Sequence, residues 1–484
     1  MLPLSHILNK CFEQGIFPDQ LKIARVCPIF KSGLVTDISN YRPISILNSF
    51  SKIFEKAIYN RLVTYIEKYN VISQCQFGFR KNYSTSMALL NLYDYISKAI
   101  DKGQYCMGVF IDLSKAFDTI NHNILLEKLN IYGIRGLPND TIRDYLCNRK
   151  QYVLLNNCKS QMLPLTVGVP QGSILGPLLF LLYINDIVDC CSHLNFILFA
   201  DDTNILYAND NLITLIKIIN TELSKLSDWF KANWLSLNLA KTSYMTFGYK
   251  NYSVSKCVSS DDSGQIFHLN LKIDDTVIDK VETTKFLGVM IDPKFLWHNH
   301  ISYLSAKIAK SLYILSRIRF KLSRKYLIQL YHSLIYPHLN YCNILWGNAS
   351  STALNHLKIL QKRALRLINR TSYLEHTDPL FSQSGILPLA DINTYCTALF
   401  LFKYIHNFLP ESCAKLLIRK HYDNDSYFIR VNSIFSIPPF RTVLRERSIT
   451  IRGPQIWKML PDKITNCTSI GCFKSNLKLT LLCM

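Results

Sequence analysis

The chain has 484 residues, of which 49% are hydrophobic and 18% are charged. This length exceeds that of one ordinary domain, and the apolar content excludes an intrinsically disordered chain. The net charge of +21 indicates a polyanionic partner, either nucleic acid or an anionic membrane surface.

The positive charge is concentrated in the last part of the chain. Residues 293–484 contain 26 basic and 8 acidic residues, a net charge of +18, whereas residues 1–292 are nearly balanced at +3. One interpretation is a carboxylate-bearing catalytic part followed by a phosphate-binding part. The alternative is that the basic side chains only solvate helix faces.

Cysteine usage and targeting signals indicate a soluble, intracellular chain. The 15 cysteines form no CxxC pair, and no histidine lies at zinc-knuckle spacing from Cys467 and Cys472, so we expect neither a disulfide framework nor a zinc site. The N-terminus lacks the pattern of a signal peptide. The uncharged stretch 160–185 contains three prolines, which argue against a membrane helix. We therefore expect no membrane partner.

Hydrophobic periodicity predicts a mixed first part and a helical second part. Up to residue 292, helical spacing predicts helices over 51–69, 85–100, 121–132, 173–186 and 213–233. Short apolar runs predict strands over 106–113, 152–156, 163–167 and 285–291, and two strands over 195–208 joined at Asp201-Asp202. Residues 251–265 are Ser-rich and predict a loop. After Pro293 only helices are predicted, over 300–322, 323–336, 352–369 and 389–408.

Three aspartates are predicted at the ends of these apolar strands. Asp112 ends the strand over 106–113, and Asp201 and Asp202 follow 89 residues later. Taken singly, Asp112 could be a helix cap and the adjacent pair an ordinary Asp-rich turn. Together they repel one another, and divalent cations would relieve that repulsion. Two magnesium ions ~3.5–4 Å apart can clamp both the attacking and the leaving oxygen of a phosphoryl transfer.

Seven sequence blocks occur in one order across the first part of the chain. They are NYRPISIL (40–47), QFGFR (76–80) with Ser84-Thr85, FIDLSKAFD (110–118), GVPQGSILGP (168–177), FADD (199–202), LNLAKT (237–242) and FLGV (286–289). In this order the blocks resemble the fingers, palm and primer-grip motifs of non-LTR retrotransposon reverse transcriptases, especially the jockey-like group. Arg363–Arg366 and Leu387–Leu389 resemble the downstream part of these proteins more loosely.

The resemblance implies an α+β fold of the right-hand polymerase type, with fingers, a palm built on an antiparallel sheet, and a thumb. It divides the chain into fingers and palm (1–292), a helical thumb-like region (293–370) and a basic, mainly helical C-terminal region (371–484). The implied function is an RNA-directed DNA polymerase that adds dNTPs to a primer 3′-hydroxyl. Its expected cofactors are two Mg²⁺ ions, for which Mn²⁺ could substitute, and its partners are an RNA template and a DNA primer. The alternative is a catalytically inactive, nucleic-acid-binding remnant of such an element.

The resemblance assigns the metals to Asp112, Asp201 and Asp202, with the Leu113 carbonyl as a further ligand. Phe117 takes the position of the steric gate that excludes a ribose 2′-hydroxyl, unless it is an ordinary core residue.

Residues of the neighbouring motifs are assigned to the nucleotide. Gln171 would contact the incoming nucleotide, or else be only a turn residue, and Gly172 permits close backbone approach. Lys31 and Arg42 would bind the triphosphate, unless they form plain surface salt bridges. Lys241 would donate a proton to pyrophosphate.

Further basic residues are assigned to the nucleic acid, and Asp118 to a structural role as a cap or a partner of Lys115. Arg80 belongs to the second fingers motif. Five residues at steps of three, four or seven would line one face of a thumb helix along the duplex phosphates, or form a solvated face: Lys307, Lys310, Arg317, Lys321 and Arg324.

Full-length relatives of this kind carry an endonuclease domain before the polymerase. Fewer than 40 residues precede the first fingers block here. We therefore expect this chain to lack the endonuclease and to need a separate endonuclease or nicked DNA for integration, acting in the nucleus, the cytoplasm or both.

Overall fold

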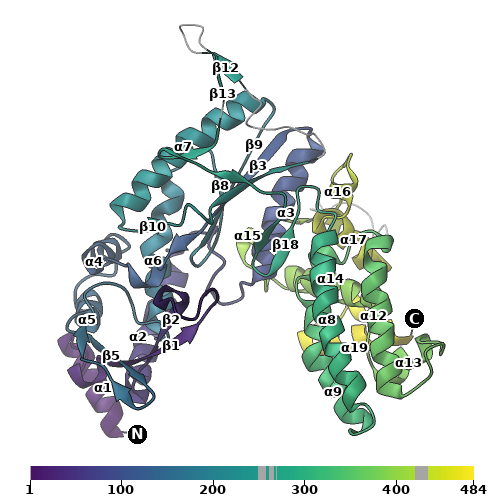
Figure 1. Cartoon of the computed structure of the whole chain (residues 1–484), viewed down its shortest axis with the longest axis horizontal. Coiled ribbons are helices and arrows are strands. Elements are labelled where there is room, and N and C mark those ends of the chain that lie inside the picture. Colours follow the sequence, from purple (N-terminus) through teal and green to yellow (C-terminus); the bar gives the residue numbers. More distant parts are fainter. Residues whose placement is uncertain (1, 249–257, 261–265, 269, 420–433, 484) are drawn as a thin grey trace, which may run out of the picture.

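The computed structural model describes residues 2–248, 258–260, 266–268, 270–419 and 434–483. Figure 1 shows two lobes, one built on strands and the helices around them and the other almost entirely helical. The first lobe carries the first six of the seven blocks, and the seventh, residues 286–289, lies in a hairpin beside the helix His298–Ile318.

The centre of the first lobe is a five-stranded sheet with the order β16-β11-β3-β9-β8. Its members are β3 (Tyr105–Ile111), β8 (Asn195–Phe199), β9 (Asp202–Asn209), β11 (Ser243–Phe247) and β16 (Asp279–Lys280). Only the β11–β16 pair is parallel. Alternate β3 side chains enter two different hydrophobic clusters, one with Cys106 and Phe110 and the other with Met107 and Val109. Helices therefore cover both faces, which explains why β3 reads as a continuous apolar run.

The faces of this sheet are covered by helices that the periodicity predicts. One face packs on α3 (Thr85–Asp101), and the other faces α6 (Leu175–Ile184) and α7 (Leu212–Ala232). The predicted helices over 51–69 and 121–132 are α2 (Ser49–Lys68) and α4 (His122–Ile131).

A second sheet lies in the part of the chain expected to form the fingers, and most of it was not predicted. It joins β1 (Ile23–Phe30) and β2 (Tyr41–Ile46) to the predicted region of β5 (Lys150–Leu155), β6 (Cys158–Lys159) and β7 (Leu163–Pro164). Helices α1 (Leu2–Gln14) and α5 (Leu137–Leu146) lie at the lower left of Figure 1, beside these strands. The β1–β2 hairpin is antiparallel, and it places residues 31 and 42 at the same end of the fingers.

The second lobe begins with α8 (His298–Ile318), which packs on α12 (Ser351–Asn369). The other helices there are α9 (Arg324–Leu334), α10 (Tyr336–Asn340), α11 (Asn343–Trp346), α13 (Asp378–Ser384), α14 (Leu389–Ile405), α15 (Glu411–Ala414), α16 (Val443–Glu446), α17 (Ile449–Met459), α18 (Asp462–Thr465) and α19 (Ile470–Cys483). The four helices predicted here are confirmed. The expectation of helices alone is corrected by two short strands, β19 (Ile418–Arg419) and β20 (Phe435–Ser436).

Two further element predictions need correction. Residues 285–291 form a hairpin of β17 (Thr284–Phe286) and β18 (Val289–Ile291), because Leu287 and Gly288 both adopt positive φ and reverse the chain. In the predicted loop over 251–265, residues 258–260 form β12, which pairs with β13 (Ile266–His268), and the rest lies outside the described residues.

A buried ionic network joins the two lobes. Asp94 of α3 is 5% exposed and accepts hydrogen bonds from Arg445 Nη1 at 2.6 Å and from Thr450 Oγ1 at 2.9 Å. Lys98 Nζ lies 2.6 Å from its second oxygen. About two turns after Asp94, at the end of α3, Asp101 Oδ1 accepts from the backbone N–H groups of Arg441 and Thr442. The last part of the chain is therefore docked onto the helix that supports the palm sheet.

Among the described residues no single helix has the length and apolar content of a membrane span. One bent pair, α13 with α14, meets that criterion when its two helices are taken together across a 49° bend.

The Asp94–Arg445 pair yields a stability prediction. Asp94→Asn leaves the Arg445 guanidinium buried without its counter-charge, so we expect a loss of about 3–5 kcal/mol in the free energy of unfolding, measured by denaturant titration. The double variant Asp94→Leu, Arg445→Met removes both charges and should lose less. Lys10→Ala, which breaks the exposed Lys10–Glu13 pair, serves as a control and should leave the transition midpoint unchanged. An Asp94→Asn variant as stable as the parent would contradict a structural role for the network.

Candidate active site

Neighbouring strands bring the three predicted aspartates together. Asp112 directly follows β3, and Asp202 is the first residue of β9. These two strands pair with Ile111 opposite Thr203, so the next residues along the register are Asp112 and Asp202. Asp201 lies in the two-residue turn between β8 and β9, which is one residue earlier than the predicted turn. The sheet thus gathers three carboxylates at one edge.

The environment of the pair in the turn favours protonation. Burial, followed by the charges of Asp201 and Asp112, raises the pKa of Asp202 to about 6. Burial and the charge of Asp112 also raise the pKa of Asp201, while the positive charges of Lys31 and Arg42 oppose that rise. The ionised forms of these carboxylates are therefore disfavoured by the protein alone, and a bound cation would stabilise them.

Asp112 is held by residues of the LNLAKT block. Its Oδ2 accepts a hydrogen bond from Asn238 Nδ2 at 3.2 Å and lies 3.6 Å from Lys241 Nζ. The Asn238 backbone N–H donates to the Asp112 carbonyl at 2.9 Å. Leu113 pairs with Leu237 in the small β4–β10 ladder, in which β4 is Leu113–Ser114 and β10 is Ser236–Leu237. This block therefore orients the backbone and the carboxylate of Asp112 together.

The chemistry of these donors fits magnesium, although they are not gathered into a ready-made site. Carboxylate oxygens are the ligands that Mg²⁺ prefers. Within the described part of the chain, no group of three or more His, Cys, Asp or Glu side chains is close enough to hold a metal ion. In this arrangement Oδ2 of Asp112 is occupied by Asn238 and Lys241 instead.

The predicted steric gate lies on a short turn after the first aspartate. Phe117 belongs to the 3₁₀ helix Ala116–Asp118, and its ring packs on Phe180 at 4.6 Å and edge-on to Phe79 at 6.4 Å between centroids. The side chain is half-buried. The ring is thus supported from two sides while part of it remains accessible.

The predicted nucleotide contact Gln171 is tied to the same turn. Its Nε2 donates to both carboxylate oxygens of Asp118, at 2.9 and 3.0 Å. Burial raises the pKa of Asp118. This contact gives Asp118 a structural partner, Gln171, that differs from the predicted Lys115. Whether Gln171 also contacts a nucleotide stays a prediction.

Gly172 lies where the palm meets the fingers. It adopts φ +107°, and a Cβ there would lie 2.9 Å from the Ser45 carbonyl oxygen, so only glycine fits without strain. The neighbouring Gln171 carbonyl accepts from Ser45 N–H at 2.7 Å. The GVPQG block is therefore held against strand β2.

Lys31 and Arg42 are exposed at the end of the fingers hairpin, and among the described residues neither forms a salt bridge. Their charges nevertheless act on the carboxylates, since they oppose the rise in the pKa of Asp201. This position places two cations over the aspartates, as binding of a triphosphate there would require.

The basic residues predicted to bind nucleic acid differ in their exposure and in their hydrogen-bond partners. Arg80 donates to the carbonyls of Ser73 and Gln76, at 2.8 and 3.1 Å, so it stabilises its own loop. The prediction that five residues line one helix face is wrong, because α8 ends at Ile318. Lys321 lies in the following turn, and Arg324 begins α9, where it bonds to Asn369, Gln383 and Ser384. Of the five predicted residues, Lys307, Lys310 and Arg317 lie exposed on α8.

Two functional neighbours were not predicted. Asn238 lies within a recognised block, but its contact with Asp112 depends on a tertiary pairing. Glu55 of α2 is fully buried, and its Oε2 accepts from the backbone N–H groups of Ile174 and Leu175, at 2.6 and 3.3 Å, at the start of α6. A carboxylate at a helix N-terminus is the signal for such a contact, although nothing in the local sequence pairs these segments.

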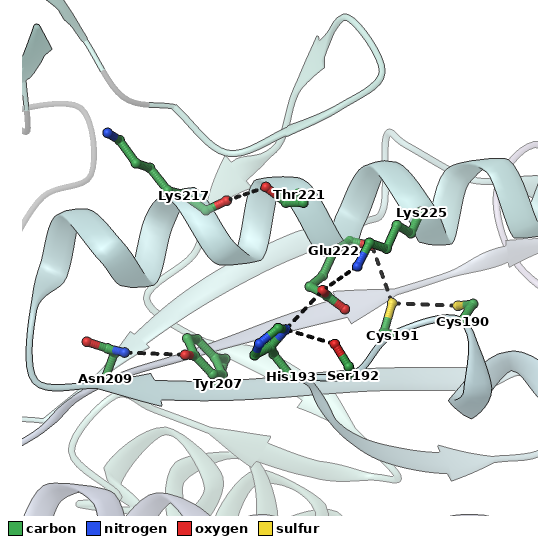
Figure 2. Close-up of polar contacts among 10 residues, drawn as sticks. All are labelled: Cys190, Cys191, Ser192, His193, Tyr207, Asn209, Lys217, Thr221, Glu222 and Lys225. Carbon is green, nitrogen blue, oxygen red and sulfur yellow. Dashed lines mark hydrogen bonds and ion pairs between the residues drawn. The ribbon is translucent and has the colours of Figure 1, made fainter. Parts of the chain in front are cut away.

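A second polar cluster lies at the other end of β8. Figure 2 shows His193 and Lys225 pointing toward the carboxylate of Glu222, with hydrogen bonds of 3.1 and 2.9 Å to its Oε1. Despite burial, the bonds from Lys225 and His193 lower the pKa of Glu222. Cys191 Sγ donates to the Glu222 carbonyl at 3.4 Å. This cluster fastens α7 to the strand that leads to the carboxylates.

Comparison with known proteins agrees with this geometry. Residues 29–291 match the reverse transcriptase (RNA-dependent DNA polymerase) family. The chain is 28% identical over 404 residues to the RNA-directed DNA polymerase from mobile element jockey of Drosophila melanogaster, covering 80% of this chain and 42% of that protein. It is 29% identical over 394 residues to the probable RNA-directed DNA polymerase from transposon BS of the same species, covering 77% of this chain and 41% of that protein. The chain thus spans about two fifths of the curated relatives that it matches.

Among solved structures, a telomerase from Candida albicans covers 78% of this chain and 64% of its own chain, with 10% identity and a TM-score of 0.36.

The matched family confirms the resemblance to jockey-like reverse transcriptases and the α+β right-hand polymerase fold with a helical C-terminal part. The three carboxylates lie within the matched residues, at the edge of the sheet that forms the palm. The chain belongs to the reverse transcriptase (RNA-dependent DNA polymerase) family.

Proposed function

We propose that this chain is an RNA-directed DNA polymerase that extends a primer 3′-hydroxyl with dNTPs on an RNA template. The observation that carries the proposal is the convergence of Asp112, Asp201 and Asp202 at one edge of the palm sheet, with raised pKa values at the last two. Structural carboxylates at such a density are costly, whereas a phosphoryl-transfer site needs them.

The three aspartates, with the Leu113 carbonyl, would hold two Mg²⁺ ions. When bound, these ions would lower the pKa of the primer hydroxyl and stabilise the charge of the departing pyrophosphate. Ionised Asp201 and Asp202 are needed for this role.

The chain's own residues would place the nucleotide. Lys31 and Arg42 would neutralise the triphosphate, and Phe117 would exclude the ribose 2′-hydroxyl. Asp118 would orient the Gln171 amide, and Lys241, 3.6 Å from Asp112, would protonate the leaving pyrophosphate. Arg80, Lys307, Lys310 and Arg317 are the candidates for contacts with the nucleic acid. Integration of a complete retrotransposon copy would further require nicked DNA, in the nucleus or the cytoplasm.

The double variant Asp201→Ala, Asp202→Ala tests the site. We expect dNTP incorporation on poly(rA)/oligo(dT) with magnesium to fall by more than roughly 100-fold, the scale of one lost electrostatic group in a transition state. Asp189→Ala, at an exposed aspartate outside the site, is the control. A folded parent chain that binds duplex but incorporates nothing would favour the nucleic-acid-binding remnant.

Phe117→Ala tests the steric gate. Without the ring, a 2′-hydroxyl meets no clash, so we expect the preference for dNTPs over rNTPs to fall on the order of 100-fold. The measurement is kcat/KM for dTTP and UTP on the same primer–template. Phe117→Tyr keeps the bulk and should keep the preference. If Phe117→Ala keeps the preference for dTTP over UTP, Phe117 is not the steric gate.

Lys307→Ala, Lys310→Ala tests the thumb face. Both side chains are exposed on α8, and we expect affinity for an RNA–DNA duplex to weaken for every sequence tried. The slope of log K against log salt should become shallower by about 2, one for each phosphate contact. Fluorescence anisotropy over a salt series measures this, with Lys458→Ala as the control. An unaltered slope would mean that this face only solvates the helix.

A further inference from the structure

The turn that carries the catalytic pair holds an unfavourable backbone conformation. Ala200 adopts φ +56°, a region that side-chain-bearing residues rarely occupy. It sits between Phe199 and Asp201, in a two-residue turn closed by the Phe199–Asp202 pair. The direction of both carboxylates depends on this residue, so a contact that fixes Ala200 fixes the site.

The QFGFR block lies directly against this turn. Phe77 N–H donates to the Leu198 carbonyl at 2.8 Å, and Leu198 N–H donates to the Cys75 carbonyl at 2.9 Å. Gln76 forms a parallel bridge with Leu198. The segment therefore runs beside β8 and reaches the turn with Gln76.

The Gln76 side chain makes the decisive contact. Its Oε1 accepts hydrogen bonds from Ala200 N–H at 3.0 Å and from Gly78 N–H at 2.8 Å, and the residue is 2% exposed. Both partners are backbone donors, so the atom facing them must be an acceptor, and the amide orientation is fixed by chemistry. The oxygen of Gln76 thus joins the two segments.

The QFGFR segment and the Ala200 turn are in close backbone contact. A Cβ at Gly78 would lie 2.4 Å from the Ala200 nitrogen, so the loop can approach the turn this closely only with glycine. The next residue, Phe79, has φ +53° and places its ring edge-on to Phe117. One loop therefore touches the carboxylate turn and the predicted sugar gate together.

The Gln76 amide satisfies two backbone donors with its oxygen while its own nitrogen stays unsatisfied among the described residues. In the described part of the chain, Nε2 of Gln76 is buried without a hydrogen-bond partner. An unsatisfied buried donor disfavours folding, but an apolar side chain would leave the N–H groups of Ala200 and Gly78 without their acceptor. A glutamate would supply the same acceptor but would add a negative charge beside Asp201 and Asp202. A neutral acceptor such as the Gln76 amide oxygen binds the Ala200 N–H without adding negative charge to the carboxylate site.

We propose that Gln76 is a positioning residue, which fixes the Ala200 turn through its Oε1 and thereby aims Asp201 and Asp202. The expected effect on kcat rests on the proposed polymerase function. The expected effect on the conformation of the Ala200 turn does not.

The test compares two buried glutamines. Gln76→Met keeps the length of the side chain and removes the acceptor. Gln361→Met is the matched control, because Gln361 is 1% exposed and bonds to Tyr331 and Leu387 within the helical lobe, away from the carboxylates. For each chain we would measure kcat and the dTTP KM on poly(rA)/oligo(dT), the melting temperature, and hydrogen exchange of the peptide spanning residues 198–202.

We expect Gln76→Met to lower kcat by about 10- to 100-fold, since a misplacement of ~1 Å can cost on the order of 100-fold in rate. The dTTP KM should change little, and exchange in the 198–202 peptide should rise at temperatures where the chain stays folded. Gln361→Met should lower the melting temperature but leave both kcat and the exchange of the 198–202 peptide unchanged. Gln76→Glu, which keeps the acceptor, should restore the slow exchange of the turn.

Three results would overturn the proposal: an unchanged kcat in Gln76→Met, unchanged exchange in its turn, or an equal loss of kcat in Gln361→Met. If the parent chain itself incorporates no dNTP, the polymerase function fails. The exchange measurement still decides then whether Gln76 holds the turn.

Discussion

Mutual repulsion among Asp112, Asp201 and Asp202 is the constraint around which the palm is built. Three carboxylates at one sheet edge disfavour the folded state unless something fixes and neutralises them. The fold meets the first need with buried strands, since β3 and β9 are paired along their whole length and covered on both faces. Cations from distant segments neutralise part of the negative charge: Lys241 lies beside Asp112, and Lys31 comes from the fingers hairpin. The remaining negative charge is the part that suits a metal-dependent site.

The supporting contacts come from motifs that are separated along the chain but adjacent in space. Gln171 bonds to Asp118, Ser45 bonds to Gln171, and Glu55 receives the first N–H groups of α6. Each of these contacts crosses from fingers to palm or from one palm motif to another. The region around the carboxylates is therefore shaped by hydrogen bonds between motifs that are far apart along the chain.

The sequence alone predicts the palm well because its elements carry strong local signals. The strand of residues 106–113 is a buried apolar run that ends in an aspartate, and α3 and α7 keep helical spacing over four or more turns. No helix or strand was predicted in the first 50 residues, because β1 alternates buried and exposed residues for only part of its length and then becomes exposed. The hairpin at Leu287-Gly288 was missed because a leucine with positive φ has no sequence signature. The contacts of Asn238, Glu55 and Gln76 were beyond reach for a different reason, since each joins residues more than 100 positions apart.

The link between Asp94 and Arg445 also sets an order of events during synthesis. The two residues are 351 positions apart, so at ~5–20 residues per second the guanidinium is made tens of seconds after its carboxylate. All seven sequence blocks, the last of which ends at residue 289, are made before that interval ends. All of these blocks are therefore made before Asp94, which pairs with Lys98 on its own helix, obtains its buried partner Arg445. Docking of α16 on α3 should therefore be completed late in translation, after the motifs of the carboxylate site have been made.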